Sequence, residues 1–292
     1  MKLAVLTRLP NYYTEKRLKE EGEKRGHEMI VVRYSDCHIN LTSDNAGVYY
    51  RGELLDDLDA VISRVAPPMV SYGAAVVRQL ESQQVYAANG SVALVRSWDK
   101  FRTLQVLSRA KVTIPQTVFS READDVDTVL ESLDVPLIVR PAMGYGDGSS
   151  VLAETKRSAR SVIKAFSVSD KTFLIQELAQ AGDGTFRAMV IGSSIVASIK
   201  MPSIRDENES PVPYSLTPEQ KRIAQRASKA LGLTVCTVDI GQTEKGPVII
   251  DVQPSPSLDI IEKTTGKNIA GKLIEYIEIN AKRQNKKDKV GA

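Results

Sequence analysis

Strand-like and helix-like segments alternate along the first 95 residues, and no other feature of the sequence restricts the fold as strongly. Apolar runs typical of buried strands lie at residues 2–7, 28–35, 58–65 and 85–90, and amphipathic helical patterns lie at 14–27 and 71–83. Strands that alternate with helices form parallel sheets whose faces the helices cover. The first part of the chain therefore predicts an N-terminal α/β lobe that ends near residue 95.

The rest of the sequence mixes hairpins with helices, and 292 residues are sufficient for two or three packed lobes. One hairpin is predicted over 187–201 with Gly192 at its turn, and another over 234–253. A capping box at Thr217 and Gln220 begins a helix that stops at Gly232. Further helices are predicted over 97–112, 121–133 and 270–283, a strand and a helix within 151–166, and further strands over 113–120, 136–142 and 172–179.

Charge and cysteine content favour a cytoplasmic protein. The net charge of +3 is small, and much of the positive excess lies in the terminal run AKRQNKKDKVGA. Such a tail is typical of a solvated terminus, and contact with nucleic acid is the alternative. Cys37 and Cys236 have no metal-ligand spacing and are typical of a reducing compartment. No signal-peptide pattern and no long apolar run occur, so we expect no membrane span.

The stretch VIIDVQPSPSLD, residues 248–259, places two oxygen-bearing side chains at the end of an apolar run. Strand alternation predicts that Asp251 and Gln253 point to the same side, and the prolines that follow end the strand. Two interpretations are open at this point. The pair belongs to a site for a metal and phosphate, or it is a polar strand end without chemistry.

Motifs spread over nearly the whole chain give these residues a context. In order, they are MKLAVLTR, SWDKFRTLQVLSRAKVTIPQT, PLIVRPAMGYGDGSSVLAET, FLIQEL, TVDI, IIDVQPSPSLDIIEKTTG and NIAGKLIEYIE. This order resembles the ATP-grasp ligases, specifically the ribosomal-protein glutamate ligase (RimK) group. The resemblance implies an α/β ATP-grasp fold of three lobes: 1–95 (pre-ATP-grasp), 96–178 (central) and 179–285 (C-terminal), with a basic tail at 286–292.

The resemblance also implies an activity, in which ATP phosphorylates a carboxylate and an amine then displaces the phosphate to form an amide. Lys100 matches a phosphate-binding lysine, and Arg140 stands where the family usually has a second one. Glu177 and Leu178 match the hinge that meets ribose and adenine. Arg187 matches a catalytic arginine near the phosphates or the substrate carboxylate. For each of these residues, an ordinary surface or strand-end role is the alternative.

The implied metal ligands are Asp239, Asp251 and Gln253, in positions where the family usually has Asp, Glu and Asn. They imply one or two Mg²⁺ ions, with Mn²⁺ as a substitute. A shorter acid beside a longer amide keeps oxygen ligands on one face of the strand.

Three departures from the family pattern support a different reading. The glycine loop MGYGDGSS has shifted glycines and an added Asp147, Thr185 replaces an acid, and the segment 202–220 is acidic with Arg205 as its one cation before Lys221. Because these changes remove positive charge or ligands, the alternative is a catalytically degenerate homologue that acts as a binding, scaffold or regulatory subunit.

The substrate side is less defined by the sequence. A group of N-terminal residues is suited to a carboxylate-bearing amino acid, peptide or protein tail, or is simply a solvated helix start: Arg8, Tyr12, Tyr13, Lys16, Arg17 and Arg64. The resemblance further implies a homo-oligomer, with a tetramer expected.

Overall fold

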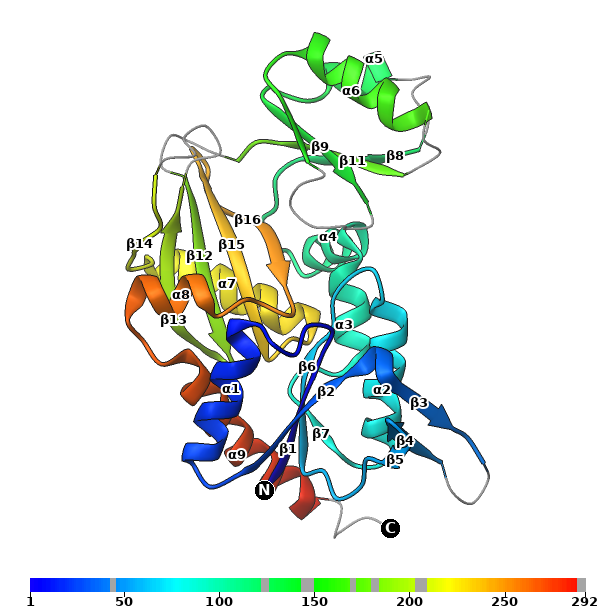
Figure 1. Ribbon diagram of the computed structural model, residues 1–292. Coiled ribbons are helices and arrows are strands. Elements are labelled where there is room, and N and C mark those ends of the chain that lie inside the picture. The colour runs from blue at the N-terminus through cyan, green and yellow to red at the C-terminus, as the bar shows by residue number, and fades with distance from the viewer. Residues whose placement is uncertain are drawn as a thin grey trace.

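The computed structural model describes residues 1–42, 46–121, 126–142, 150–168, 172–179, 184–202 and 209–287. Within these ranges the chain forms three lobes, each built on its own main sheet (Figure 1). The predicted α/β architecture with parallel and antiparallel sheets is confirmed.

The N-terminal lobe carries the predicted parallel sheet. Its strands are β1 (Lys2–Thr7), β2 (Glu28–Arg33), β6 (Ala60–Arg64) and β7 (Tyr86–Ala87), in the order β2-β1-β6-β7. Helices α1 (Tyr13–Lys24) and α2 (Val70–Ser82) follow β1 and β6. A short 3₁₀ turn, η1 (Tyr34–Asp36), leads into a small antiparallel sheet that was not predicted: β3 (Cys37–Asn40), β4 (Gly47–Tyr50) and β5 (Glu53–Leu54).

The predicted helix at 97–112 is two helices, α3 (Ser91–Trp98) and α4 (Lys100–Arg109). They are separated at Asp99, whose backbone is extended and whose Oδ1 accepts a hydrogen bond of 2.9 Å from the Arg102 amide. This N-cap satisfies one of the open amides of α4 and fixes where the helix begins. Lys100 is therefore the first residue of a helix rather than a residue within one.

The central lobe is an antiparallel sheet with two helices on one face (Figure 1). Its strands have the order β10-β9-β11-β8: β8 (Thr117–Ser120), β9 (Leu137–Pro141), β10 (Val151–Ala153) and β11 (Phe173–Glu177). Helices α5 (Val126–Glu131) and α6 (Lys156–Val168) pack on it through a core that includes Leu137, Phe173 and Ile163.

The C-terminal lobe is an antiparallel sheet in the order β14-β13-β12-β15-β16. Its elements are β12 (Thr185–Ile191), β13 (Ser194–Met201), β14 (Val212–Pro213), α7 (Pro218–Leu231), β15 (Val235–Thr243), β16 (Gly246–Gln253), α8 (Asp259–Thr265) and α9 (Ile269–Lys287). Both predicted hairpins are confirmed. Gly192 turns the first with φ +63°, and Gly232 ends α7 with φ +72° after the predicted Thr217–Gln220 capping box.

The two faces of this sheet differ in a way that creates the site. One face is apolar along its length, with Ala188, Val238 and Val252 packed under α7. The other face is apolar near the N-terminal lobe, where Met189 and Val235 join a core that α9 and β1 share. Farther along, β12, β15 and β16 carry polar side chains on the same face, and Arg187, Asp251 and Gln253 among them line a pocket.

Lobe boundaries at 95, 178 and 285 remain a proposal, since the first lies inside α3 and the last inside α9. The C-terminal helix α9 lies beside α1 in the N-terminal lobe (Figure 1), and Arg25 and His27 contact Glu278. Among the described helices, none is both long and apolar enough for a membrane span.

Candidate active site

A row of opposite charges crosses three neighbouring strands of the C-terminal lobe. Arg187 on β12 lies directly opposite Asp239 on β15, and Asp239 lies directly opposite Asp251 on β16. Residues that pair directly in an antiparallel sheet share one face. Strand register therefore brings together side chains that are far apart in the sequence.

A bulge in β16 decides which face Asp251 uses. Ile240 pairs with Ile249 while Asp239 pairs with Asp251, so Ile250 is an extra residue in β16. Ile249 packs under α7, whereas Asp251 lines the pocket on the opposite face. Simple alternation would place Ile249 and Asp251 on the same face. The bulge re-aims the strand end, as bulges next to active sites commonly do.

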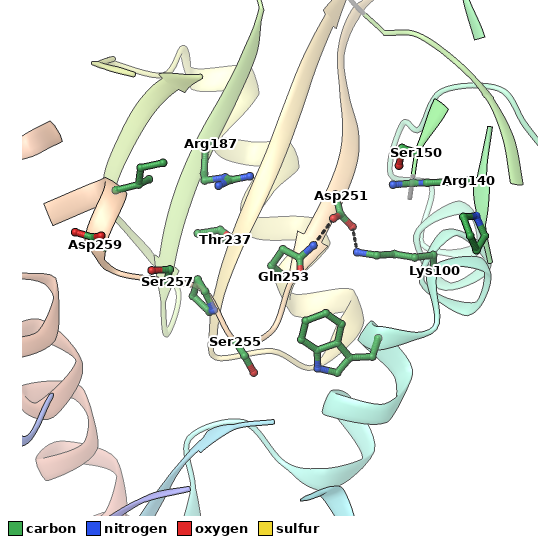
Figure 2. A pocket seen from close by; sticks show the side chains of 14 residues that line it. Lys100, Arg140, Ser150, Arg187, Thr237, Asp251, Gln253, Ser255, Ser257 and Asp259 are labelled. Carbon is green, nitrogen blue, oxygen red and sulfur yellow. Dashed lines mark hydrogen bonds and ion pairs between the residues drawn. The ribbon is translucent and has the colours of Figure 1, made fainter. Parts of the chain in front are cut away.

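The polar face, α4 and β9 surround a pocket of about 400 Å³. Its size lies within the range of roughly 300–1,000 Å³ that is usual for small-molecule sites. The residues that line it are Trp98, Lys100, Arg140, Pro141, Ser150, Arg187, Thr237, Asp251, Gln253, Ser255, Pro256, Ser257, Asp259 and Ile260. Figure 2 shows Lys100 and Arg140 extending toward Asp251 from the side opposite Arg187.

Lys100 and Asp251 form a buried ion pair at the centre of this pocket. Lys100 Nζ lies 2.5 Å from Asp251 Oδ1, and the two side chains are 9% and 12% exposed. Gln253 donates from Nε2 to Asp251 Oδ2 at 2.5 Å. Burial of the carboxyl opposes its ionisation, but the charges of Lys100 and Arg140 outweigh burial and hold the pKa of Asp251 below its ordinary value. Asp251 is therefore a carboxylate at neutral pH.

Arg187 and Asp239 form a second ion pair one strand away. The Arg187 guanidinium donates from Nε to Oδ1 at 2.7 Å and from Nη2 to Oδ2 at 2.8 Å. This fork geometry is the strong form of an arginine–carboxylate contact. Arg187 lines the pocket, whereas Asp239 does not line it and is only 8% exposed. The predicted metal ligand Asp239 is thus bonded to Arg187 and does not itself line the pocket.

Arg140 has donor capacity that the described chain does not use. Its Nη2 donates to Gln176 Oε1 at 3.2 Å, while its buried Nε has no hydrogen-bond partner among the described residues. A buried donor of this kind calls for an acceptor. Because Arg140 lines the pocket, a ligand oxygen is a suitable acceptor.

Glu177 and Leu178 lie outside the residues that line the pocket. Glu177 Oε1 accepts from the Asp134 amide at 3.0 Å, and the Leu178 amide donates to Pro136 O at 2.9 Å. Both groups therefore stabilise the end of β11 in this conformation.

The donor set fits Mg²⁺ in kind, since carboxylate and amide oxygens are the hard ligands it prefers. Each carboxylate is, however, already engaged: Asp239 by Arg187, and Asp251 by Lys100 and Gln253. Among the described residues, no group of three or more His, Cys, Asp or Glu is placed to hold a metal. Metal binding at Asp239, Asp251 and Gln253 therefore requires that the two cations first move to another anion.

The segment after β16 supplies lining residues that the sequence did not predict. Ser255, Ser257 and Asp259 come from the run PSPSLD, where only Asp251 and Gln253 just upstream were assigned a role. Buried Asn89 holds the start of this segment by donating from Nδ2 to Pro254 O at 2.8 Å, and it also donates to Val235 O of β15 at 2.6 Å. Two features of the sequence could have indicated that this segment lines the pocket: its serines and its position directly after the predicted metal ligands.

Other predicted lining residues lie outside the described part of the chain. Most of the glycine loop with Asp147, and Arg205 in the acidic segment, fall there. Ser150, the last residue of the glycine loop, lines the pocket. Thr185 is the first residue of β12, two positions before Arg187.

Comparison with known proteins identifies the family. The family model described as the RimK PreATP-grasp domain matches residues 1–94, and the RimK-like ATP-grasp domain matches residues 97–277. A protein named "Probable alpha-L-glutamate ligase" from Picosynechococcus sp. is 39% identical over 290 residues, 96% of each chain. A protein of the same name from Ectopseudomonas mendocina is 40% identical with the same coverage.

Solved structures agree on the fold. The RimK domain protein ATP-grasp from Sphaerobacter thermophilus superposes with a TM-score of 0.73 at 18% identity, over 95% of this chain and 100% of that one. The D-alanine–D-alanine ligase of Bacillus anthracis, complexed with ATP, gives 0.74 at 15% identity over 99% of both. The ATP-grasp ligase PsnB, complexed with Mg and ADP, gives 0.76 at 19% identity, over 96% and 98%. The chain therefore belongs to the RimK-like ATP-grasp family of ATP-dependent carboxylate–amine ligases.

Proposed function

We propose that the pocket between α4, β9 and the polar face of β12, β15 and β16 binds ATP and forms an amide bond through an acyl phosphate. The observation that supports this most strongly is the row Lys100, Asp251, Asp239 and Arg187, in which two neighbouring carboxylates have a cation on each side. A triphosphate and its metal need the same two kinds of group, cations for phosphate and carboxylates for metal.

The proposed chemistry has two steps. An oxygen of the substrate carboxylate attacks the γ-phosphorus of ATP, and ADP leaves. The amine then attacks the acyl carbon, inorganic phosphate leaves, and the proton of the amine passes to solvent. Lys100 and Arg140 would hold phosphate oxygens, and Arg187 would stabilise the charge that develops on the transferred phosphoryl group. Preorganised donors of this kind commonly contribute about a hundredfold or more to the rate.

Binding is proposed to exchange ion-pair partners. When the phosphates approach, Lys100 and Arg187 turn from Asp251 and Asp239 to phosphate oxygens, and the two carboxylates with Gln253 become available to one or two Mg²⁺ ions, or to Mn²⁺. Bound Mg²⁺ supplies neutralisation of phosphate charge. Neither half of the exchange is favourable alone, because it would leave a buried charge without a partner.

The nucleotide base and the substrate follow from the family. Glu177 and Leu178 would meet ribose and adenine at the end of β11. Since the relatives are named alpha-L-glutamate ligases, we propose L-glutamate as the amino acid, joined to an amino acid, peptide or protein partner. We also propose that the protein acts in the cytoplasm as a homo-oligomer, with a tetramer expected.

Calorimetric titration with ATP, with and without Mg²⁺, tests the proposed site. We expect binding to be at least about tenfold tighter with Mg²⁺, which corresponds to about 1.4 kcal/mol. Asp239→Ala is expected to remove at least about tenfold of this Mg²⁺-dependent affinity. Asp56→Ala is the matched control, because Asp56 is exposed and lies in the N-terminal lobe away from the pocket.

Two outcomes would contradict the proposal at different points. Unchanged affinity in Asp239→Ala would remove the metal assignment but leave the nucleotide site. No heat and no thermal shift at millimolar ATP would favour the degenerate binding or scaffold protein. If MgATP binds, release of phosphate in the presence of L-glutamate and acidic peptides separates a ligase from a homologue that binds ATP without turnover.

A further inference from the structure

A second pocket, of about 190 Å³, lies in the N-terminal lobe beside the first. It opens where β1 and β6 end, between Thr7 and Arg64. These strands are neighbours in the sheet, but the chain leaves β1 through α1 toward β2 on one side and leaves β6 through α2 toward β7 on the other. Crevices at such a reversal of strand order, beyond the carboxyl ends of the strands, are the usual ligand sites of open α/β sheets.

The pocket offers an unpaired cation and an open helix start. Arg8 lines it and is exposed, and its side chain makes no hydrogen bond or ion pair with the rest of the described chain. Helix α1 begins at Tyr13 with Tyr12 as its N-cap, and no side chain caps its amides. The first amides of a helix and its dipole favour an anion. This end of the pocket therefore suits a carboxylate.

The pocket also offers an unpaired carboxylate oxygen. Glu15 is 2% exposed and lines the pocket. Its Oε1 accepts from Thr7 Oγ1 at 2.9 Å and from Arg64 Nε at 2.6 Å, but its buried Oε2 has no donor among the described residues. A buried acceptor without a donor is costly and calls for a partner. An ammonium group, which has three donors, supplies one.

The second pocket shares part of its wall with the first. Ser255, Ser257 and Asp259 line both. The N-terminal lobe holds this shared wall through the bond from Arg64 Nη1 to Pro256 O at 2.6 Å and the bond from the Leu258 amide to Thr14 Oγ1 at 3.0 Å. A ligand in the second pocket thus lies next to the proposed phosphate site.

We propose that this second pocket binds a single free α-amino acid, with a carboxylate at Arg8 and the start of α1 and the ammonium group at Glu15 Oε2. The inference rests on the proposed ligase function, to which it adds the binding site of one substrate. The volume is below the roughly 300–1,000 Å³ of sites for larger ligands, which suits one amino acid rather than a folded tail. A site for a purely anionic ligand would have no use for Glu15.

Only some of the N-terminal residues predicted to bind a substrate line this pocket. Tyr12, Tyr13, Arg8 and Arg64 line the pocket, whereas Lys16 and Arg17 do not. Arg17 instead bonds Glu20, Glu21 and Glu262. Lys16 is exposed on the same helix, so it provides a matched control for a charge change outside the pocket.

The test compares two ligands that differ in the amino group. L-glutamate and glutarate are titrated calorimetrically into the full-length protein, both alone and with Mg²⁺ and the non-hydrolysable analogue AMPPNP. We expect glutarate to bind at least about tenfold more weakly than L-glutamate, which corresponds to about 1.4 kcal/mol of binding free energy. The other amino acids are screened by thermal shift at millimolar concentration, so that a different side-chain preference is also detected.

Variants assign the two ends of the ligand. Arg8→Gln is expected to weaken L-glutamate and glutarate alike, by about tenfold, and Lys16→Gln to change neither. Glu15→Gln replaces the unpaired acceptor by a donor, so it is expected to remove the preference for L-glutamate and leave glutarate unchanged. A variant that only destabilised the fold would weaken the binding of both ligands and would not change the ratio of their affinities.

Each contrary outcome has a separate meaning. Equal affinity for glutarate and L-glutamate would overturn the ammonium site and favour an anionic tail. No effect of Arg8→Gln, or no binding of any amino acid while MgAMPPNP binds, would overturn the pocket and leave the proposed ATP site. Binding of L-glutamate that responds to Arg8→Gln and Glu15→Gln, without any nucleotide binding, would keep the pocket and overturn the proposed function.

Discussion

The two pockets differ in how their charges are satisfied. In the pocket on the C-terminal sheet, the carboxylates of Asp251 and Asp239 each face a cation. In the N-terminal pocket, the guanidinium of Arg8 and the Oε2 atom of Glu15 have no hydrogen-bond or ion-pair partner within the described chain. The two carboxylates at the first site are thus paired within the protein, whereas Arg8 and one oxygen of Glu15 at the second site are open to a ligand.

This difference predicts different links between binding and stability. Paired buried charges are stable together, and removal of one partner leaves the other charge uncompensated. An exposed unpaired group adds little to stability, so its loss affects the ligand and not the fold. The ion pair of Lys100 and Asp251 in the first pocket should therefore couple function to folding strongly, and the exposed Arg8 of the second pocket only weakly.

The largest expected effect comes from removing the cation of the buried pair. Lys100→Met leaves Asp251 without its closest positive charge in a site where both side chains are at most 12% exposed. We expect the free energy of unfolding to fall by about 3 kcal/mol, measured by urea denaturation. Arg102→Met on the exposed side of the same helix is the control and is expected to stay within about 0.5 kcal/mol.

Equal stability of the two variants would mean that the pair contributes nothing to the fold. The predicted difference in stability coupling between the two pockets would then be wrong.

A smaller effect is expected from pH. The pKa of Asp251 is held below its ordinary value of 3.8 by Lys100 and Arg140, against the effect of burial. A carboxyl whose folded pKa is lowered stabilises the fold above its unfolded pKa, and this contribution is lost as pH falls through the folded pKa. We expect the stability difference between wild type and Asp251→Asn to shrink below about pH 4, by at most about 1.4 kcal/mol per pH unit.

The comparison with Asp251→Asn is necessary because other carboxyls titrate in the same range. A hydrogen bond from Lys24 lowers the pKa of Glu21 to about 2, and one from Arg25 lowers the pKa of Glu278 to about 2. Both contribute equally to wild type and variant, so they cancel. A difference that stays constant from pH 6 to pH 3 would show that Asp251 is not stabilised as a carboxylate.

Local patterns explain how much of the fold was predictable. Short stretches of sequence predict the parallel N-terminal sheet, the two C-terminal hairpins and the capping box of α7. The structure confirms all of them. The break at Asp99 was missed because the apolar spacing of Phe101, Leu104 and Leu107 continues smoothly into the residues before it. The small β3-β4-β5 sheet was missed because its strands are short and mostly polar at their ends.

The site was less predictable because it depends on pairing between distant strands. The sequence indicated that Asp251 and Gln253 share a face, and both line the pocket. It could not indicate that Arg187 would lie opposite Asp239, since that requires the register of β12 on β15. Nor could it indicate the bulge at Ile250, because an apolar run of Val248, Ile249 and Ile250 reads as a regular buried strand.

The smallest expected effect on stability is at the second pocket. Arg8→Gln removes an exposed guanidinium that makes no hydrogen bond or ion pair within the described chain, so we expect the free energy of unfolding to change by less than about 0.5 kcal/mol. The same variant is expected to weaken amino-acid binding, which separates ligand binding from folding at this site. A loss of stability as large as that of Lys100→Met would mean that Arg8 is held by the protein itself. In that case the start of α1 would have to supply the anion site alone.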